Sequence, residues 1–174
     1  MIKMQFIATY GCLSCYDSMS KLYRIAFKQS IPSDINTVWD FISSPLNLKL
    51  ITPPYMGFNI TSDMDSEKMY PGQIISYKVS PVAGIKMNWV TEITHVKDHE
   101  YFVDEQRFGP YTLWHHKHFI KPIPGGVEMT DIVDYKIPFG FLGDIANAIL
   151  VKKQLKEIFD FRFNKMEELF GKMK

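Results

Sequence analysis

The sequence predicts an α+β fold: a curved antiparallel sheet of about seven strands wrapped around one long C-terminal helix, with two short helices after the first strand. Three observations support this prediction. Between residues 58 and 137, segments of alternating polarity are separated by turns that contain Gly, Pro or Asp. Residues 141–173 contain no proline, and their apolar side chains recur at helical spacing. Aromatic residues make up 14% of the chain, which favours a large core or an aromatic-lined pocket.

Length and charge restrict the class of protein. The 174 residues are typical of one domain, and we expect residues 1–20 to be a flexible leader and residues 21–174 a single domain. Twenty Lys and Arg face nineteen Asp and Glu, so the general basic field of a nucleic-acid-binding protein is absent. No apolar run approaches the roughly 18 residues that span a bilayer. We therefore expect no nucleic-acid partner and no integral membrane segment.

The leader carries both cysteines of the chain, Cys12 and Cys15, in C-x-x-C spacing. A redox motif needs a strand before it and a helix that begins at the first cysteine, and a structural zinc site needs two more ligands. Neither context is evident, and the segment is too short and too polar for a secretory signal. We interpret the leader as mobile, with Met19 as an alternative start. A cysteine-free domain after it is typical of the cytoplasm.

The first strand and helix are expected at the start of the domain. Residues 23–31 alternate apolar with polar side chains, as a half-buried strand does. Ser33 is the expected N-cap of the following helix, with Asp34 favourable in its first turn. Pro45 ends this helix, and residues 46–51 allow one or two further helical turns. The apolar stripe of the first helix comprises Ile35, Val38, Trp39 and Ile42.

About six further strands follow, at a spacing that suits an antiparallel meander. After them, residues 141–173 are expected to form an amphipathic helix on the order of 40 Å long. A long helix laid across the concave face of a curved sheet covers that face and can leave a cavity beneath it. The expected strands span residues 58–61, 72–80, 85–96, 100–108, 111–121 and 127–137.

Six segments carry a resemblance to a known superfamily: residues 89–93 (WVTEI), 102–106 (FVDEQ), 109–111 (GPY), 114–119 (WHHKHF), 131–135 (DIVDY) and 138–140 (PFG). They resemble the core of the START-like superfamily (SRPBCC; polyketide cyclase/dehydrase and lipid transport), and in particular its small stand-alone bacterial SRPBCC proteins. The resemblance covers about residues 21–172 and implies the helix-grip fold, also described as START-like or Bet v 1-like. It implies a ligand-binding domain without an assigned ligand, because the superfamily binds lipids, hormones, polyketides and quinones, and only some members are enzymes.

The strongest local feature is the segment WHHKH, residues 114–118. On a strand, Trp114, His116 and His118 share one face. If the turn at residues 109–110 pairs residues whose numbers sum to about 220, Gln106 faces Trp114 and Asp104 faces His116. These neighbours then lie on the same face of the sheet.

Asp131 extends this patch. If the turn at residues 122–126 pairs numbers that sum to about 249, Asp131 lies opposite His118. Its stripe is otherwise apolar, so we place it facing inward, into the cavity. Candidate apolar wall residues complete the pocket. The expected ligand-binding residues are Trp89, Asp104, Gln106, Trp114, His116, His118, Asp131, Tyr135, Phe159 and Phe163.

Three functions are compatible with such a patch. The first is a cytoplasmic protein that binds or carries a small hydrophobic molecule (lipid, polyketide or quinone-like), whose polar head the patch orients. The second is a cyclase, dehydratase or hydrolase in which His116 or His118 is the general base, Asp104 or Asp131 orients it, and Tyr135 is the acid. The third is a regulatory module that binds a partner protein. We favour ligand contact over catalysis.

The pair His116 and His118 also has the spacing of metal ligands, because H-x-H on a strand points both imidazoles the same way. Asp104 or Asp131 would be the third ligand. Two histidines at this spacing are common by chance, and the superfamily that the chain resembles seldom uses metal. We therefore predict neither a metal nor a cofactor. Nucleophilic catalysis is not favoured, since residues 21–174 contain no cysteine and no serine in a nucleophile-elbow turn.

Overall fold

The computed structural model describes residues 21–64, 66–82 and 84–173, so the predicted leader and its two cysteines lie outside the described residues. Elements η1 and η2 are 3₁₀ turns, and η3 is a π-helical turn. The elements are β1 (Tyr23–Ile31), α1 (Ile35–Ile42), η1 (Pro45–Lys49), η2 (Pro54–Met56), β2 (Asn59–Ile60), β3 (Ile74–Val82), β4 (Ile85–Lys97), β5 (Tyr101–Phe108), β6 (Leu113–Ile123), β7 (Gly126–Lys136), α2 (Gly140–Ala146), η3 (Asn147–Val151) and α3 (Lys152–Phe170).

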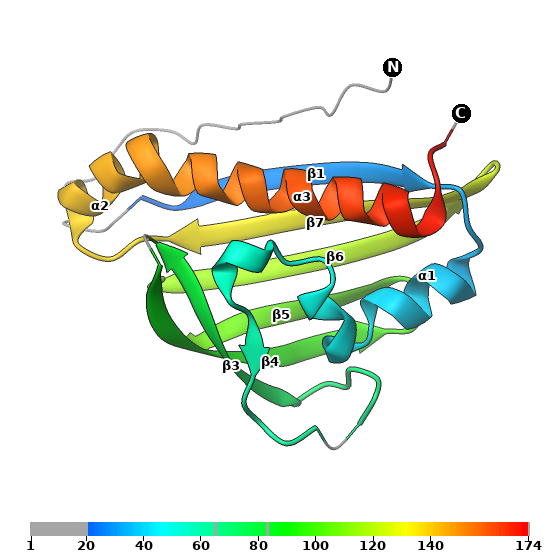
Figure 1. Cartoon of the computed structure of the whole chain (residues 1–174), viewed down its shortest axis with the longest axis horizontal. Coiled ribbons are helices and arrows are strands. Elements are labelled where there is room, and N and C mark those ends of the chain that lie inside the picture. The colour runs from blue at the N-terminus through cyan, green and yellow to red at the C-terminus, as the bar shows by residue number, and fades with distance from the viewer. Residues whose placement is uncertain (1–20, 65, 83, 174) are drawn as a thin grey trace.

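The strands form one antiparallel sheet of seven strands in the order β1-β7-β6-β5-β4-β3-β2. The sheet curves, and α3 runs along it beside β1 and β7, while α1 lies near the C-terminal end of α3, where Phe41 meets Phe170 edge to face (Figure 1). β1 pairs with β7 although more than ninety residues separate them, which closes the meander on its N-terminal strand. The predicted fold class, an α+β sheet wrapped around a C-terminal helix, is confirmed.

The predicted register holds at the two positions that matter for the site. Asp104 pairs with His116 across β5 and β6, and His118 pairs with Asp131 across β6 and β7. The predicted pairing of Gln106 with Trp114 is wrong, because the β5–β6 ladder ends one residue earlier, at Glu105. There the side chain of Gln106 folds back on the turn and bonds both the carbonyl oxygen and the N–H of Tyr111, at 2.6 and 3.2 Å.

Two predicted helix boundaries are wrong. The N-cap of α1 is Asp34 and not Ser33, because the Asp34 carboxylate accepts the Thr37 N–H at 3.0 Å, the contact that an N-cap makes. The C-terminal helix is divided into α2, η3 and α3 and ends at Phe170. At the π turn Asn147 is buried, and its side-chain oxygen accepts the Tyr135 hydroxyl at 2.9 Å. This bond ties the turn to β7.

The core is divided around a cavity. One cluster packs α1 against β5 and β7, with Trp39 edge-on to Phe102, as expected for helix-to-sheet packing. A second lies between α3 and strands β1 and β7, where Phe27 stacks on Phe159 at 4.0 Å. The third surrounds Trp89 on β4. Members of all three line one cavity, so the apolar interior surrounds a space instead of filling it.

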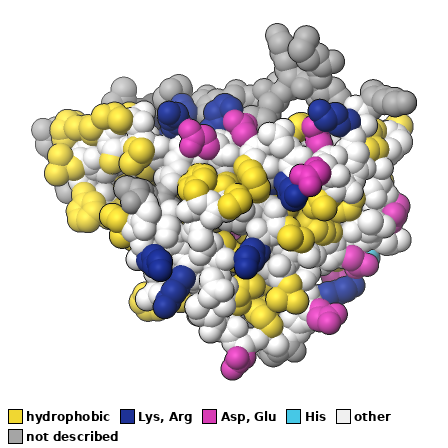
Figure 2. All heavy atoms as spheres, in the orientation of Figure 1, with side chains coloured by type: hydrophobic (Ala, Val, Ile, Leu, Met, Phe, Trp, Pro, Cys, Tyr) yellow, Lys and Arg dark blue, Asp and Glu magenta, His cyan; other side chains and the backbone are white. Residues whose placement is uncertain are grey.

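The surface of the described residues has an apolar end. Figure 2 shows hydrophobic side chains gathered at the left, over α2 in the orientation of Figure 1. Phe139, Phe141 and Leu142 are each more than two-thirds exposed there. Patches of this kind contact other molecules in many proteins. In the described part of the chain, every helix is too short or too polar to cross a membrane.

Candidate functional site

The cavity has a volume of about 150 Å³ and lies between the concave face of the sheet, α3 and the 3₁₀ turns. Its walls are mostly apolar and aromatic. The sheet contributes Trp89 and Trp114, whose rings meet edge to face at 5.3 Å, and α3 contributes Phe159 and Met166. A mostly apolar cavity with a few convergent polar groups is the usual form of a small-molecule site.

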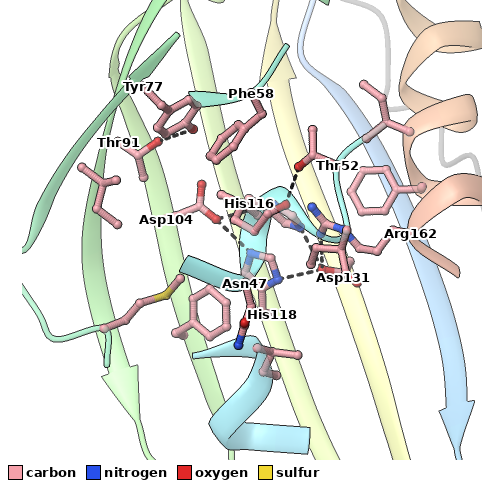
Figure 3. A pocket seen from close by; sticks show the side chains of 18 of the residues that line it. Asn47, Thr52, Phe58, Tyr77, Thr91, Asp104, His116, His118, Asp131 and Arg162 are labelled. Carbon is pink, nitrogen blue, oxygen red and sulfur yellow. Dashed lines mark hydrogen bonds and ion pairs between the residues drawn. The ribbon is translucent and has the colours of Figure 1, made fainter. Parts of the chain in front are cut away.

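The polar groups converge on one wall. Asp104, His116, His118 and Asp131 come from three adjacent strands, and Arg162 reaches them from α3 (Figure 3). The rings of His116 and His118 lie 3.7 Å apart. Because strands alternate their faces, residues 116 and 118 both point inward, and residue 131 faces them from the neighbouring strand.

Each imidazole lies between two carboxylates. His118 Nε2 is 2.9 Å from Asp104 Oδ2, and its Nδ1 is 2.7 Å from Asp131 Oδ1. His116 Nε2 is 3.0 Å from the same Asp131 oxygen, while its Nδ1 is 3.5 Å from Asp104 Oδ2. An ionised carboxylate only accepts hydrogen bonds, so the ring nitrogens at 2.7–3.0 Å are the donors.

The surroundings of the two histidines shift their pKa values in opposite directions. Burial lowers the pKa of His116 to about 4, assisted by the neighbouring His118. Burial also opposes charge on His118, but its bonds to Asp104 and Asp131 outweigh this cost and raise its pKa. Burial likewise opposes ionisation of Asp131, yet its bonds to the two histidines hold the pKa of that carboxyl far below its usual range. These shifts favour ionised carboxylates at Asp104 and Asp131, a neutral imidazole at His116 and a protonated imidazole at His118.

Arg162 completes the cluster, and the sequence analysis did not single it out. Its Nη1 lies 3.7 Å from Asp131 Oδ1, and its guanidinium lies over the Phe159 ring at 5.0 Å. Among the described residues, Arg162 Nε is one of three buried side-chain polar atoms without a hydrogen-bond partner. The sequence held a signal for it, since Arg162 interrupts the apolar stripe of the long helix, where a cation is unexpected.

A second polar group lies on the sheet wall opposite α3 (Figure 3). The hydroxyls of Tyr77 and Thr91 are 2.9 Å apart, and Trp89 Nε1 donates to Thr91 Oγ1 at 3.0 Å. Burial, followed by the charge of Asp104, raises the pKa of Tyr77, so its phenol stays neutral. The sequence analysis identified Trp89 but neither of these two hydroxyls.

Of the ten expected ligand-binding residues, seven line the cavity and three do not. Gln106 is absent from the cavity lining because it bonds the backbone of the adjacent turn. Tyr135 is buried and donates its hydroxyl to Asn147, and Phe163 lines a separate small pocket behind α3. The other seven line the cavity: Trp89, Asp104, Trp114, His116, His118, Asp131 and Phe159.

No family model and no curated protein matches the chain, but many solved structures share its fold. Protein CV1439 from Chromobacterium violaceum has a TM-score of 0.64 and 12% identity, over 86% of this chain and 98% of that one. TTHA0849 from Thermus thermophilus has a TM-score of 0.59 and 18% identity, over 83% and 94%. Ara h 8.0201 has a TM-score of 0.58 and 13% identity, over 85% and 99%. These likenesses concern the fold, which is the Bet v 1-like helix-grip fold.

Proposed function

We propose that this protein binds or carries a small hydrophobic molecule, such as a lipid, a polyketide or a quinone-like compound, in the cavity beneath α3. The observation that carries the proposal is an apolar cavity with one polar wall. Each Å² of apolar ligand surface removed from water contributes about 25 cal/mol, so the apolar walls supply affinity. A Bet v 1-like fold is consistent with this role.

In this proposal the polar cluster orients the head of the ligand. Arg162 Nε is a buried donor without a partner, and the paired hydroxyls of Tyr77 and Thr91 lie on another wall. An oxygen-bearing head group would accept from the guanidinium while the ligand's apolar body contacts Trp89 and Trp114. The same proposal places the chain in the START-like (SRPBCC) superfamily and in the cytoplasm, on the sequence segments and the cysteine-free domain described above.

The acid–base enzyme is the weaker alternative for the same cavity. A general base works best when its pKa lies near the working pH, and the pKa of His116 is lowered to about 4. Both ring nitrogens of His118 are held by carboxylates at 2.9 and 2.7 Å.

The other alternative is a module that binds a partner protein. The exposed apolar surface at Phe139, Phe141 and Leu142 is the feature that such a module would use.

Native mass spectrometry of the gently purified protein tests the proposal. We expect a mass above that of the chain, and release of a small apolar molecule after denaturation and organic extraction. The native mass of the chain alone, together with failure of added fatty acids and quinones to displace a fluorescent apolar probe, would contradict the proposal.

A matched pair of variants on η1 links the binding to the cavity. Leu48 lines the cavity, whereas Leu46 on the same 3₁₀ turn is 53% exposed and does not. Leu48→Trp fills part of the space, so we expect it to weaken probe binding at least about tenfold, the effect of losing 1.4 kcal/mol. Leu46→Trp should leave binding within about twofold. Equal effects of the two substitutions would place the probe elsewhere.

A further inference from the structure

The arrangement of the two histidines around their carboxylates suggests more than a hydrogen-bond network. The nitrogens that face Asp131 are His116 Nε2 and His118 Nδ1. The opposite nitrogens, His116 Nδ1 and His118 Nε2, both face one oxygen of Asp104. Two imidazoles thus direct one nitrogen each toward a shared carboxylate, while a second carboxylate holds both rings from behind.

This is how proteins build transition-metal sites. A ligating histidine usually donates its other ring N–H to a carboxylate, which fixes the orientation of the ring. Asp131 is in the position to do this for both rings at once, at 3.0 and 2.7 Å. It is buried, and Arg162 lies 3.7 Å from it. The guanidinium therefore approaches the supporting carboxylate of the cluster.

The spacing of the other three groups suits one ion. Potential ligand atoms of Asp104, His116 and His118 all lie within 4.8 Å of one another. Ligands about 2.1 Å from a zinc ion, at angles of 90–110°, are about 3.0–3.4 Å apart. The separations here are 3.5 Å from His116 Nδ1 and 2.9 Å from His118 Nε2 to Asp104 Oδ2. The 3.5 Å contact is longer than an ordinary hydrogen bond, and both separations are close to those between two ligands of one ion.

We propose that Asp104, His116 and His118 bind one divalent first-row transition-metal ion at the wall of the cavity, with Asp131 as the carboxylate that orients both histidines. Two imidazoles and one carboxylate favour Zn²⁺, Co²⁺ or Fe²⁺ over Mg²⁺ and Ca²⁺, which take oxygen ligands. All three ligands line the cavity, so the ion is reached from it. The proposal does not depend on an apolar ligand, because it concerns only the side chains of this wall.

Isothermal titration of the full chain with Zn²⁺ tests the site. The background carries Cys12→Ser and Cys15→Ser, since two thiols also bind zinc. We expect one equivalent of Zn²⁺ to bind with a Kd of about 10 μM or tighter, and Mg²⁺ not to compete. Asp104→Asn and His116→Gln each change a direct ligand and should weaken binding at least as much as the loss of a residue that only supports a ligand, which costs about 10–100-fold. Circular dichroism confirms that each variant is folded.

His115→Gln is the matched control. His115 lies on the same strand but on the outer face, where its Nδ1 is 2.9 Å from Glu105. The control should bind zinc as the parent does.

X-ray absorption of the Zn²⁺- or Co²⁺-loaded parent tests the site without any substitution. We expect its spectrum to show two imidazole ligands and only nitrogen and oxygen atoms around the ion. Three results would each overturn the proposal: no zinc binding up to about 1 mM, unchanged binding in both ligand variants, or loss of binding in His115→Gln. If the cavity binds an apolar probe but the protein binds no metal, the metal proposal fails and the proposed function stands.

Discussion

Strand β7 carries two buried aspartates that face opposite sides of the sheet. Asp131 points into the cavity, where its partners are His116, His118 and Arg162, all at least about nine-tenths buried. Asp134 points outward and bonds Arg24 at 2.5 Å and Lys117 at 2.7 Å.

The difference lies in the partners and not in the aspartates. The Arg24 side chain is 53% exposed and that of Lys117 is 22% exposed, so both cations keep access to water without Asp134. The imidazolium of His118 and the guanidinium of Arg162 have little access to water, and Asp131 is the carboxylate that both contact. Losing a salt bridge whose partner is exposed to solvent lowers the free energy of unfolding only slightly. A buried cluster that loses one partner is left with uncompensated charge, which costs more. The inner face is therefore the part of the sheet that tolerates least change.

Asp131→Asn is the change with the largest expected effect. It leaves two buried cationic groups without their shared carboxylate, and removing one partner of a buried pair costs about 3–5 kcal/mol. Urea unfolding of this variant and of Asp134→Asn, followed by circular dichroism, measures the contrast. We expect Asp134→Asn to lower the free energy of unfolding by only about 1 kcal/mol. Equal losses in the two variants would remove the distinction between the faces.

The pH dependence of stability is expected to have a maximum near pH 6.5, the ordinary value for histidine. Between about pH 4 and pH 6.5 the unfolded chain protonates residue 116, while folded His116 stays neutral, so stability rises with pH. Above this range folded His118, held between Asp104 and Asp131, keeps a proton that the unfolded chain releases, so stability falls as pH rises. Each pKa unit corresponds to about 1.4 kcal/mol.

Urea midpoints measured from pH 4 to pH 9, in buffer with a chelator, test this curve. His118→Gln should abolish the fall on the alkaline side. His115→Gln, which changes the outer face of the same strand, should preserve the maximum. A flat profile in the parent protein would contradict the assigned charges of the inner cluster.

Arg24→Ala should have the smallest effect. Its bond to Asp134 is largely exposed to solvent on the arginine side, and Lys117 remains to pair with the carboxylate. We expect a loss of less than about 1 kcal/mol, which 1 M NaCl diminishes because salt screens exposed charges. Unfolding of the variant at low and high salt checks this. A loss as large as that of Asp131→Asn would show that the outer bridge is as important as the inner cluster.

Local pattern was enough to predict most of the sheet. Polarity alternation and the turns at residues 109–110 and 122–126 predicted that His116 and His118 share a face, with Asp104 and Asp131 opposite them. Short hairpins make this inference sound, because a tight turn fixes which residues pair on its two sides. The cap of α1 was misplaced by one residue for a related reason: Ser33 and Asp34 are both good caps, and only the bond to Thr37 distinguishes them.

Sequence patterns were sufficient to predict the strands, their turns, the long amphipathic C-terminal segment and the inward face with its histidines and aspartates. Each of these depends on residues close together in the chain or joined by a short hairpin. Three contacts could be found only in the folded structure: Arg162 lies near Asp131, Asn147 accepts a hydrogen bond from the Tyr135 hydroxyl, and Gln106 bonds the backbone of Tyr111 and not the cavity. The first two contacts depend on how α3 and η3 are placed against the sheet, and the third on a competition between a side chain and a nearby backbone. Periodicity carries no information about either, because it reports which face a residue occupies and not which partner it meets there.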